Sequence, residues 1–146
     1  MAHICGEVLI QAPVDEVFDF VVDERNEPRY NPRIVRAEKL GDGPVGRGSR
    51  FVAQPAGMGA AGAMTVEVLE YERPRRFHNI IRSSYMQIDG TVTFTDEGGG
   101  TLLRWNWDMN LVGPIKVFSP VLGLVAPRWE RRNWVALKRY VESGRT

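Results

Sequence analysis

Asp89 and Asp108 are the acidic residues whose positions best suggest acid–base chemistry. Each lies in a segment that alternates apolar and polar residues, and the glycine-rich stretch 97–100 between the segments predicts a hairpin. In the pairing that places Phe94 opposite Leu103, the two aspartates face each other, and a like-charge pair raises the pKa of one carboxyl group. The same pairing puts both on the polar face of the hairpin, away from its tryptophans. A solvated pair is therefore the simpler interpretation.

Histidine and cysteine are too few for a metal centre or a nucleophilic triad. The sequence has one cysteine, Cys5, and two histidines, so it predicts no internal disulfide and no structural zinc site. A metal site made of carboxylates alone is left open but has no support in the sequence, and we expect no metal and no cofactor. His3 lies near the start of the chain, and His78 lies next to Phe77 in a predicted strand, which favours structural roles for both. Cys5 alternates with Ile4 and is expected on the outer face of an edge strand.

Two other stretches carry residue types that bind anions in some proteins. The glycine-rich segment 55–63 joins two predicted strands and lacks the lysine–serine pair and the following helix of a phosphate-binding loop. A mobile hairpin flap over a cavity fits it better. Four arginines near the C-terminus are expected to form a solvated helix face rather than an anion site. They are Arg128, Arg131, Arg132 and Arg139.

Length and charge set the class of protein. The chain has 146 residues, the size of one domain, which we place at 1–146. Nineteen basic and eighteen acidic residues leave a formal charge of +1, so nucleic acid is not an expected partner. The first residues do not resemble a signal peptide, and no apolar run is long enough to span a membrane. We expect a cytoplasmic protein with no membrane span.

The elements that must position these residues are a strand, two short helices, six further strands and a long helix. Alternation over 3–11 predicts the first strand, and apolar residues at helical spacing from Val14 predict the first helix. A second helical piece lies within 23–31. The further strands are predicted over 34–40, 49–54, 64–71, 77–83, 86–96 and 101–110. The fold class is α+β, with an antiparallel sheet of about seven strands.

The long helix is predicted from Gly113 to Gly144. Its two interior prolines, Pro120 and Pro127, should face solvent and bend it so that its apolar side is concave. Two short helices broken at Pro127 are the alternative. Helical spacing from Trp129 gives one stripe facing the sheet, which consists of Ile115, Phe118, Leu122, Val125, Trp129, Asn133, Ala136 and Tyr140.

Several short stretches resemble the START-like, or SRPBCC, helix-grip superfamily. Residues 12–18, Ala-Pro-Val-Asp-Glu-Val-Phe, are similar to its opening, and Tyr30-Asn31-Pro32 resembles its aromatic-x-Pro turn. Segments 72–77 and 99–105 are similar to its later strand connections. The nearest branch is the bacterial polyketide cyclase/dehydratase-like group. The resemblance implies a curved sheet that wraps the C-terminal helix and leaves a cavity for a hydrophobic ligand.

Three functions follow as hypotheses. The first is binding of a small hydrophobic molecule, lipid-like, aromatic or polyketide-like, by a monomer or homodimer. The second is a cyclase/dehydratase-like enzyme, in which Tyr30, Tyr85, Asn79 or a cavity carboxylate acts on an enol or a water; its catalytic residues are otherwise unknown. The third is a protein-interaction module with a filled core. The expected ligand-binding residues are Tyr30, Phe51, Phe77, Tyr85, Trp105, Trp107, Phe118, Leu122, Val125 and Trp129.

Overall fold

The computed structural model describes residues 2–144 and contains one antiparallel sheet with the strand order β1-β7-β6-β5-β4-β3-β2. The β1 strand therefore lies at one edge of the sheet and β2 at the other. The predicted strands are confirmed to within a residue or two at each end. They are β1 (Ala2–Ile10), β2 (Ile34–Leu40), β3 (Arg50–Pro55), β4 (Met64–Glu72), β5 (Arg76–Arg82), β6 (Met86–Glu97) and β7 (Gly100–Leu111).

Two short helices connect β1 to β2, and a long helix ends the described chain. The first connection contains α1 (Val14–Val22) and the 3-10 helix η1 (Glu24–Arg29), which confirms the predicted helix pair. A further 3-10 turn, η2 (Ala60–Gly62), lies in the β3–β4 loop. The C-terminal part consists of the 3-10 helix η3 (Gly113–Phe118) and the helix α2 (Ser119–Ser143).

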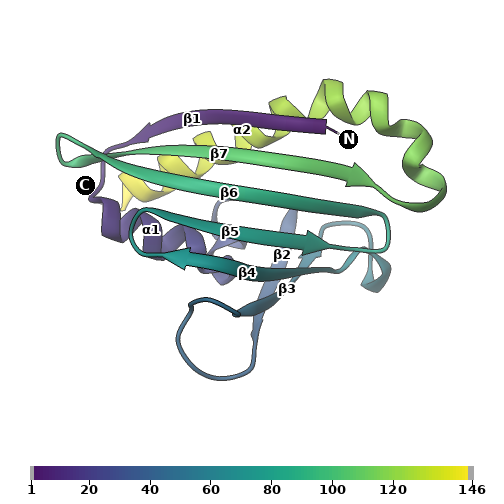
Figure 1. Ribbon diagram of the computed structural model, residues 1–146, viewed down its shortest axis with the longest axis horizontal. Coiled ribbons are helices and arrows are strands. Elements are labelled where there is room, and N and C mark those ends of the chain that lie inside the picture. The colour runs from purple at the N-terminus through teal and green to yellow at the C-terminus, as the bar shows by residue number, and fades with distance from the viewer. Residues whose placement is uncertain (1, 145–146) are drawn as a thin grey trace.

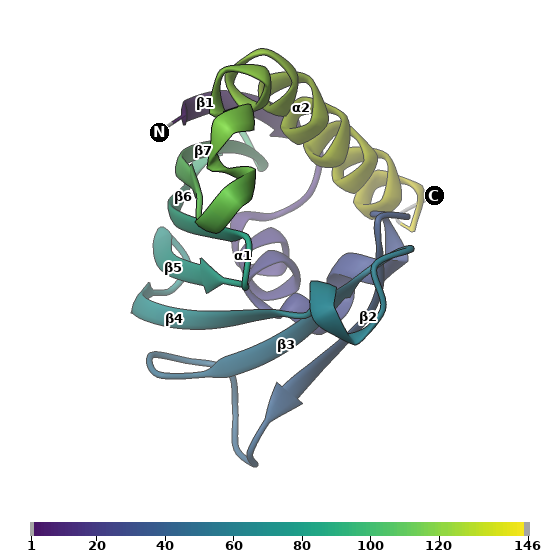
Figure 2. The same ribbon diagram turned by 90° about the vertical axis from the view of Figure 1, so that its right-hand side faces the viewer.

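The sheet curves around one side of the molecule and α2 closes the other side (Figures 1 and 2). Buried residues of α2 belong to the same core cluster as inward residues of β1, β5, β6 and β7. At the far end of the interior, α1 contributes Phe18, whose ring contacts Phe94 edge-on at 5.1 Å between centroids. The interior is therefore the space between the concave face of the sheet and the helices.

The β6–β7 hairpin has the predicted register. Gly90 lies opposite Trp107, and Val92 lies opposite Trp105. Both tryptophans are buried on the concave face, because side chains along a strand alternate between its two faces. A Cβ atom at Gly90 would lie 1.5 Å from the Trp107 ring, and one at Gly6 in β1 would lie 2.3 Å from the Trp105 ring. Because each of these glycines has no side chain, the indole from the neighbouring strand can lie directly against the sheet.

The C-terminal helix differs from its prediction in two ways. The helix is continuous through Pro127, so the alternative of two short helices broken at Pro127 is wrong. Its α-helical part begins only at Ser119, with Pro120 in the first turn. The buried face is also rotated from the predicted stripe: Ala126, Trp134 and Leu137 are buried, whereas Trp129 is 45% exposed. The predicted stripe also fails at Ile115, Phe118 and Tyr140, which are exposed.

The rotation has a physical reason. At 100° per residue, Trp129 lies about a quarter turn from the centre of the buried face. Ile115 and Phe118 belong to the 3-10 helix, whose tighter period does not continue the spacing of an α-helix. Both prolines are exposed, as predicted, and Gly144 caps the helix where the sequence placed its end.

Candidate functional site

A carboxyl group, that of Glu130, lies at the centre of the interior face of α2. Trp107 Nε1 donates a hydrogen bond of 2.7 Å to Glu130 Oε2, and Trp134 Nε1 donates one of 3.2 Å to the same oxygen. The Trp134 ring stacks on the rings of both Trp105 and Trp107, with centroid distances of 5.4 Å and 6.3 Å. The carboxyl group of Glu130 is thus bound by one side chain from the sheet and one from the helix, and its surroundings are otherwise largely apolar.

The pKa of Glu130 is raised from its ordinary 4.5 to about 7, chiefly by burial and to a smaller extent by the nearby Glu27. The indole donors and Arg33 oppose this shift because they stabilise the charged form. A carboxyl group with a pKa near neutrality exchanges its proton readily at physiological pH, which is the property required of a general acid or base. Glu130 can therefore donate or accept a proton.

Three residues of the α1–β2 connection lie within electrostatic reach of Glu130. Burial raises the pKa of Glu24 well above its ordinary value, and Glu27, Asp23 and Glu130 raise it further. Burial likewise raises the pKa of Tyr30, with added effects from Glu27, Glu24 and Glu130. Asn31 Nδ2 donates a hydrogen bond of 2.9 Å to Glu27 Oε1. We call Glu24, Glu27, Tyr30 and Glu130 the interior acidic cluster.

Three members of this cluster are only partly exposed. Glu24, Tyr30 and Glu130 are each surrounded by protein and keep part of their surface accessible to solvent. Elsewhere in the interior, buried polar atoms have no hydrogen-bond partner within the described protein, and such an atom costs about 1–3 kcal/mol. They are Asn79 Oδ1 on β5, Trp105 Nε1 on β7 and Asn133 Oδ1 on α2.

The predicted ligand-binding residues divide into three groups. Phe77, Trp105 and Trp107 are buried in the main core, and Tyr30 and Leu122 pack against it while keeping partial exposure. Phe51 of β3 belongs to a separate buried cluster with Val66 and Val68 of β4. The remaining four, Tyr85, Val125, Phe118 and Trp129, are not members of either buried cluster.

Phe118 and Trp129 were expected to face the sheet, and this orientation is wrong. Phe118 is 58% exposed. The Trp129 ring lies beneath the guanidinium of Arg33, whose Cζ is 4.7 Å from the ring centroid, at the edge of the interior. Tyr85 lies at one end of the molecule, where its hydroxyl hydrogen-bonds to Met58 Sδ at 3.5 Å.

Two residues of the site, Glu130 and Trp134, were missed by the sequence reasoning. Their signal was the spacing Ala126, Glu130, Trp134, Leu137, which follows one helix face. The glutamate interrupted this stripe and made it look less apolar than the one through Trp129. A charged residue between buried neighbours on one helix face is the pattern that would have located the site.

Asp89 and Asp108 face each other across the hairpin, as predicted, but each has a histidine partner. His78 Nε2 lies 2.6 Å from Asp89 Oδ1, and His3 Nδ1 lies 2.7 Å from Asp108 Oδ1. All four side chains project from the outer face of the sheet, away from the interior. Cys5 is exposed on the edge strand β1, also as predicted.

Within residues 2–144, no group of three or more His, Cys, Asp or Glu side chains is arranged to hold a metal ion. None of the helices in this part of the chain combines the length and the apolar character that crossing a bilayer requires.

A curved antiparallel sheet that grips a long C-terminal helix, with two short helices after the first strand, defines a helix-grip domain of the START-like class. The family described as polyketide cyclase / dehydrase and lipid transport matches residues 1–142, so the chain belongs to that family. Family and fold together indicate a domain for hydrophobic ligands. No curated protein matches the sequence.

Solved structures with low sequence identity share the fold. A START superfamily protein from Mycobacterium smegmatis superposes with a TM-score of 0.79 at 16% identity, covering 98% of this chain and 99% of that one. A protein from Thermus thermophilus gives 0.80 at 18% identity, with 99% of each chain covered. The di-domain ARO/CYC protein BexL of the BE-7585A biosynthetic pathway gives 0.73 at 22% identity, covering 97% of this chain and 47% of that one.

Proposed function

We propose that this domain binds a small, largely apolar molecule between the concave face of the sheet and α2, with a hydrogen-bonding group of the ligand directed at Glu130. The observation that carries the proposal is the enclosed carboxyl group of Glu130, held by Trp107 and Trp134 in an interior lined by aromatic rings. Apolar walls with a few fixed polar groups are typical of small-molecule sites.

The polar atoms of the interior support this proposal over a filled core. Asn79, Trp105 and Asn133 project from both walls and have unpartnered polar atoms. Buried polar groups are almost always hydrogen-bonded in folded proteins, so these atoms are suited to meet a ligand or its bound water. The interior acidic cluster favours a ligand that donates hydrogen bonds or carries a positive charge over an anionic ligand.

Titration with Nile red, a neutral dye that fluoresces in apolar surroundings, tests the proposed site. Asn133→Phe places a ring in the proposed space and should weaken dye binding by roughly tenfold or more, about 1.4 kcal/mol or more in binding free energy. Arg139→Phe puts the same ring on the exposed face of the same helix and serves as the matched control. Equal dye affinity in both variants, with unchanged thermal unfolding, would reject the interior site.

Acid–base catalysis of the cyclase/dehydratase kind is the second candidate, and Glu130 favours it. An inward ionisable group within hydrogen-bond distance of other polar groups is a feature that distinguishes an enzyme from a simple carrier. With a pKa of about 7, Glu130 could remove a proton next to a carbonyl group and return it elsewhere. Tyr30, in the same cluster, is the residue that would donate a hydrogen bond to the resulting enolate oxygen.

Deuterium exchange at the central carbon of benzoylacetone, an apolar 1,3-diketone, measures this activity by NMR. An enzyme of this kind should accelerate the exchange relative to buffer. Glu130→Gln should lower the enzyme-catalysed exchange rate at least about 100-fold, which is the usual contribution of a general base. Glu142→Gln, on the same helix but paired with Lys138 at the surface, is the control. Exchange that is equal in the Glu130 variant and the wild type would exclude this role.

A further inference from the structure

The start of the C-terminal helical region exposes an unusual number of large apolar side chains. Their exposed fractions range from 39% to 76%, with Val117 and Leu124 at the upper end. Exposed apolar residues are common singly, but a contiguous group marks an interaction surface. We call this group the apolar tip, and it consists of Ile115, Val117, Phe118, Val121 and Leu124.

A second loop lies at the same end of the molecule. The backbone N–H of Val112 donates to the carbonyl of Tyr85 at 2.9 Å, and the hydroxyl of Tyr85 contacts Met58, which is 46% exposed. Figure 2 faces this end, and both η3, in green, and the loop that carries η2, in teal, lie toward the viewer. The exposed methionine therefore lies at the same end of the molecule as the tip.

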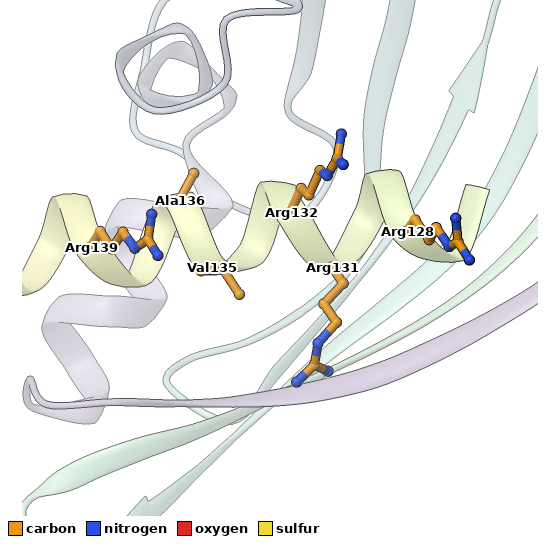
Figure 3. A pocket seen from close by; sticks show the side chains of 6 residues that line it. All are labelled: Arg128, Arg131, Arg132, Val135, Ala136 and Arg139. Carbon is orange, nitrogen blue, oxygen red and sulfur yellow. The ribbon is translucent and has the colours of Figure 1, made fainter. Parts of the chain in front are cut away.

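The outer face of α2 continues from the apolar tip as a row of arginines. Arg128, Arg131, Arg132 and Arg139 line a shallow groove of about 530 Å³ together with Val135 and Ala136 (Figure 3). Among the described residues, none of the four arginines forms an ion pair, in contrast to Arg73, Arg76 and Lys138. We call these four residues the arginine face.

Charge is distributed very unevenly over the chain. Residues 113–143 contain six basic side chains and two acidic side chains, Glu130 and Glu142, which gives this segment a formal charge of +4. Because the whole chain carries +1, the remaining residues carry −3. Glu130 points into the interior and Glu142 pairs with Lys138, so the four arginines give the outer surface of the helix its positive charge. The small net charge of the chain therefore conceals a basic helix.

We propose that the apolar tip and the arginine face together dock the domain on a lipid bilayer that contains anionic phospholipid. Along the helix axis, Arg128 follows Leu124 by four residues, a rise of roughly 6 Å. An interfacial segment inserts its apolar side chains about 5–10 Å into the boundary between head groups and acyl chains. If the apolar tip enters to that depth, Arg128 reaches the level of the phosphates, and the negative surface potential attracts the arginines that follow along the helix.

The same features argue against a protein occupant. An isologous dimer through this surface would place arginine face against arginine face, and that like-charge contact is unfavourable. Val117 and Leu124 are the most exposed members of the apolar tip. A protein interface needs a complementary shape to bury such side chains well, whereas fluid lipid adapts to them.

Co-sedimentation with vesicles tests the docking. The wild type should bind vesicles of phosphatidylcholine mixed with phosphatidylglycerol more tightly than vesicles of phosphatidylcholine alone, and added salt should remove the difference. The double variant Arg128→Gln/Arg132→Gln should bind the mixed vesicles about 30-fold more weakly. Arg36→Gln/Arg47→Gln, two exposed arginines elsewhere, is the matched control and should bind like the wild type.

The apolar tip is tested in the same assay. Val117→Asp/Leu124→Asp should reduce binding by roughly tenfold or more, since two inserted side chains become charged. Val35→Asp, at a valine that is 59% exposed on β2, should have no effect. The proposal is overturned if the wild type binds neither kind of vesicle, or if Val117→Asp/Leu124→Asp and Val35→Asp bind equally well. It is also overturned if ultracentrifugation shows that the substitutions in the apolar tip abolish self-association instead.

Discussion

At the scale of single residues, Glu130 determines the chemistry of the interior. Two indole N–H groups stabilise its carboxylate, while burial and neighbouring Glu27 favour the protonated form, and burial has the larger effect. The result is a carboxyl group that is poised between its two protonation states near neutral pH. This balance depends on tertiary structure, because Trp107 comes from the sheet and Trp134 from the helix.

The raised pKa of Glu130 makes stability depend on pH. Between pH 4.5 and about 7, the folded protein keeps the Glu130 proton that the unfolded chain has lost. The folded state thus binds more protons, so the free energy of unfolding should fall through this window, by roughly 3 kcal/mol in total. In Glu130→Gln this contribution is absent, and the variant should gain stability relative to the wild type as pH rises.

Urea unfolding of both proteins at several pH values measures the difference. Glu97→Gln, at an exposed glutamate in the β6–β7 turn, controls for the loss of a carboxyl group as such. A Glu130→Gln variant whose stability stays parallel to that of the wild type from pH 4.5 to 8 would show that this carboxyl group has an ordinary pKa.

At the scale of elements, sequence patterns predicted the strands well and the long helix incompletely. Alternation fixed the β6–β7 register because a shift by one residue would expose both tryptophans. The helix face was harder to predict, since Trp129 and Trp134 offer competing stripes and the buried one contains Glu130. Ile115 and Phe118 of the apolar tip were assigned to the face that packs on the sheet because a 3-10 turn could not be distinguished from the first turns of an α-helix.

Two glycines provide a test of the packing between these elements. Gly90→Ala should destabilise the protein by about 1–3 kcal/mol, because its new Cβ would lie 1.5 Å from the Trp107 ring and force the indole away from Glu130. Gly123→Ala in α2 meets no atom within 4 Å and should stabilise the protein by about 0.5–1 kcal/mol, since alanine favours a helix. Thermal unfolding compares them, and equal effects would contradict the described packing.

At the scale of the whole molecule, the fold separates an enclosed acidic interior from a cationic outer surface on the same helix. The inner face of α2 carries Glu130 between tryptophans, and its outer face carries the arginine face beyond the apolar tip. Family resemblance predicted the general architecture and a hydrophobic ligand. It did not predict the separation of an acidic interior from a cationic outer surface. The motifs that carry the resemblance are turns and strand ends, whereas this separation depends on residues of α2.

Native mass spectrometry of the wild-type protein tests the proposed interior site most directly. The protein should be measured freshly purified and after incubation with long-chain alcohols and with hydroxylated polycyclic aromatic compounds, which are apolar molecules that donate a hydrogen bond, beside Asn133→Phe. The wild type should carry additional mass that leaves on collisional activation as a small, largely apolar compound, and the variant should carry much less of it. A wild-type protein that shows only the mass of its own chain under every condition, and that also fails to bind Nile red, would contradict a ligand site between the sheet and α2.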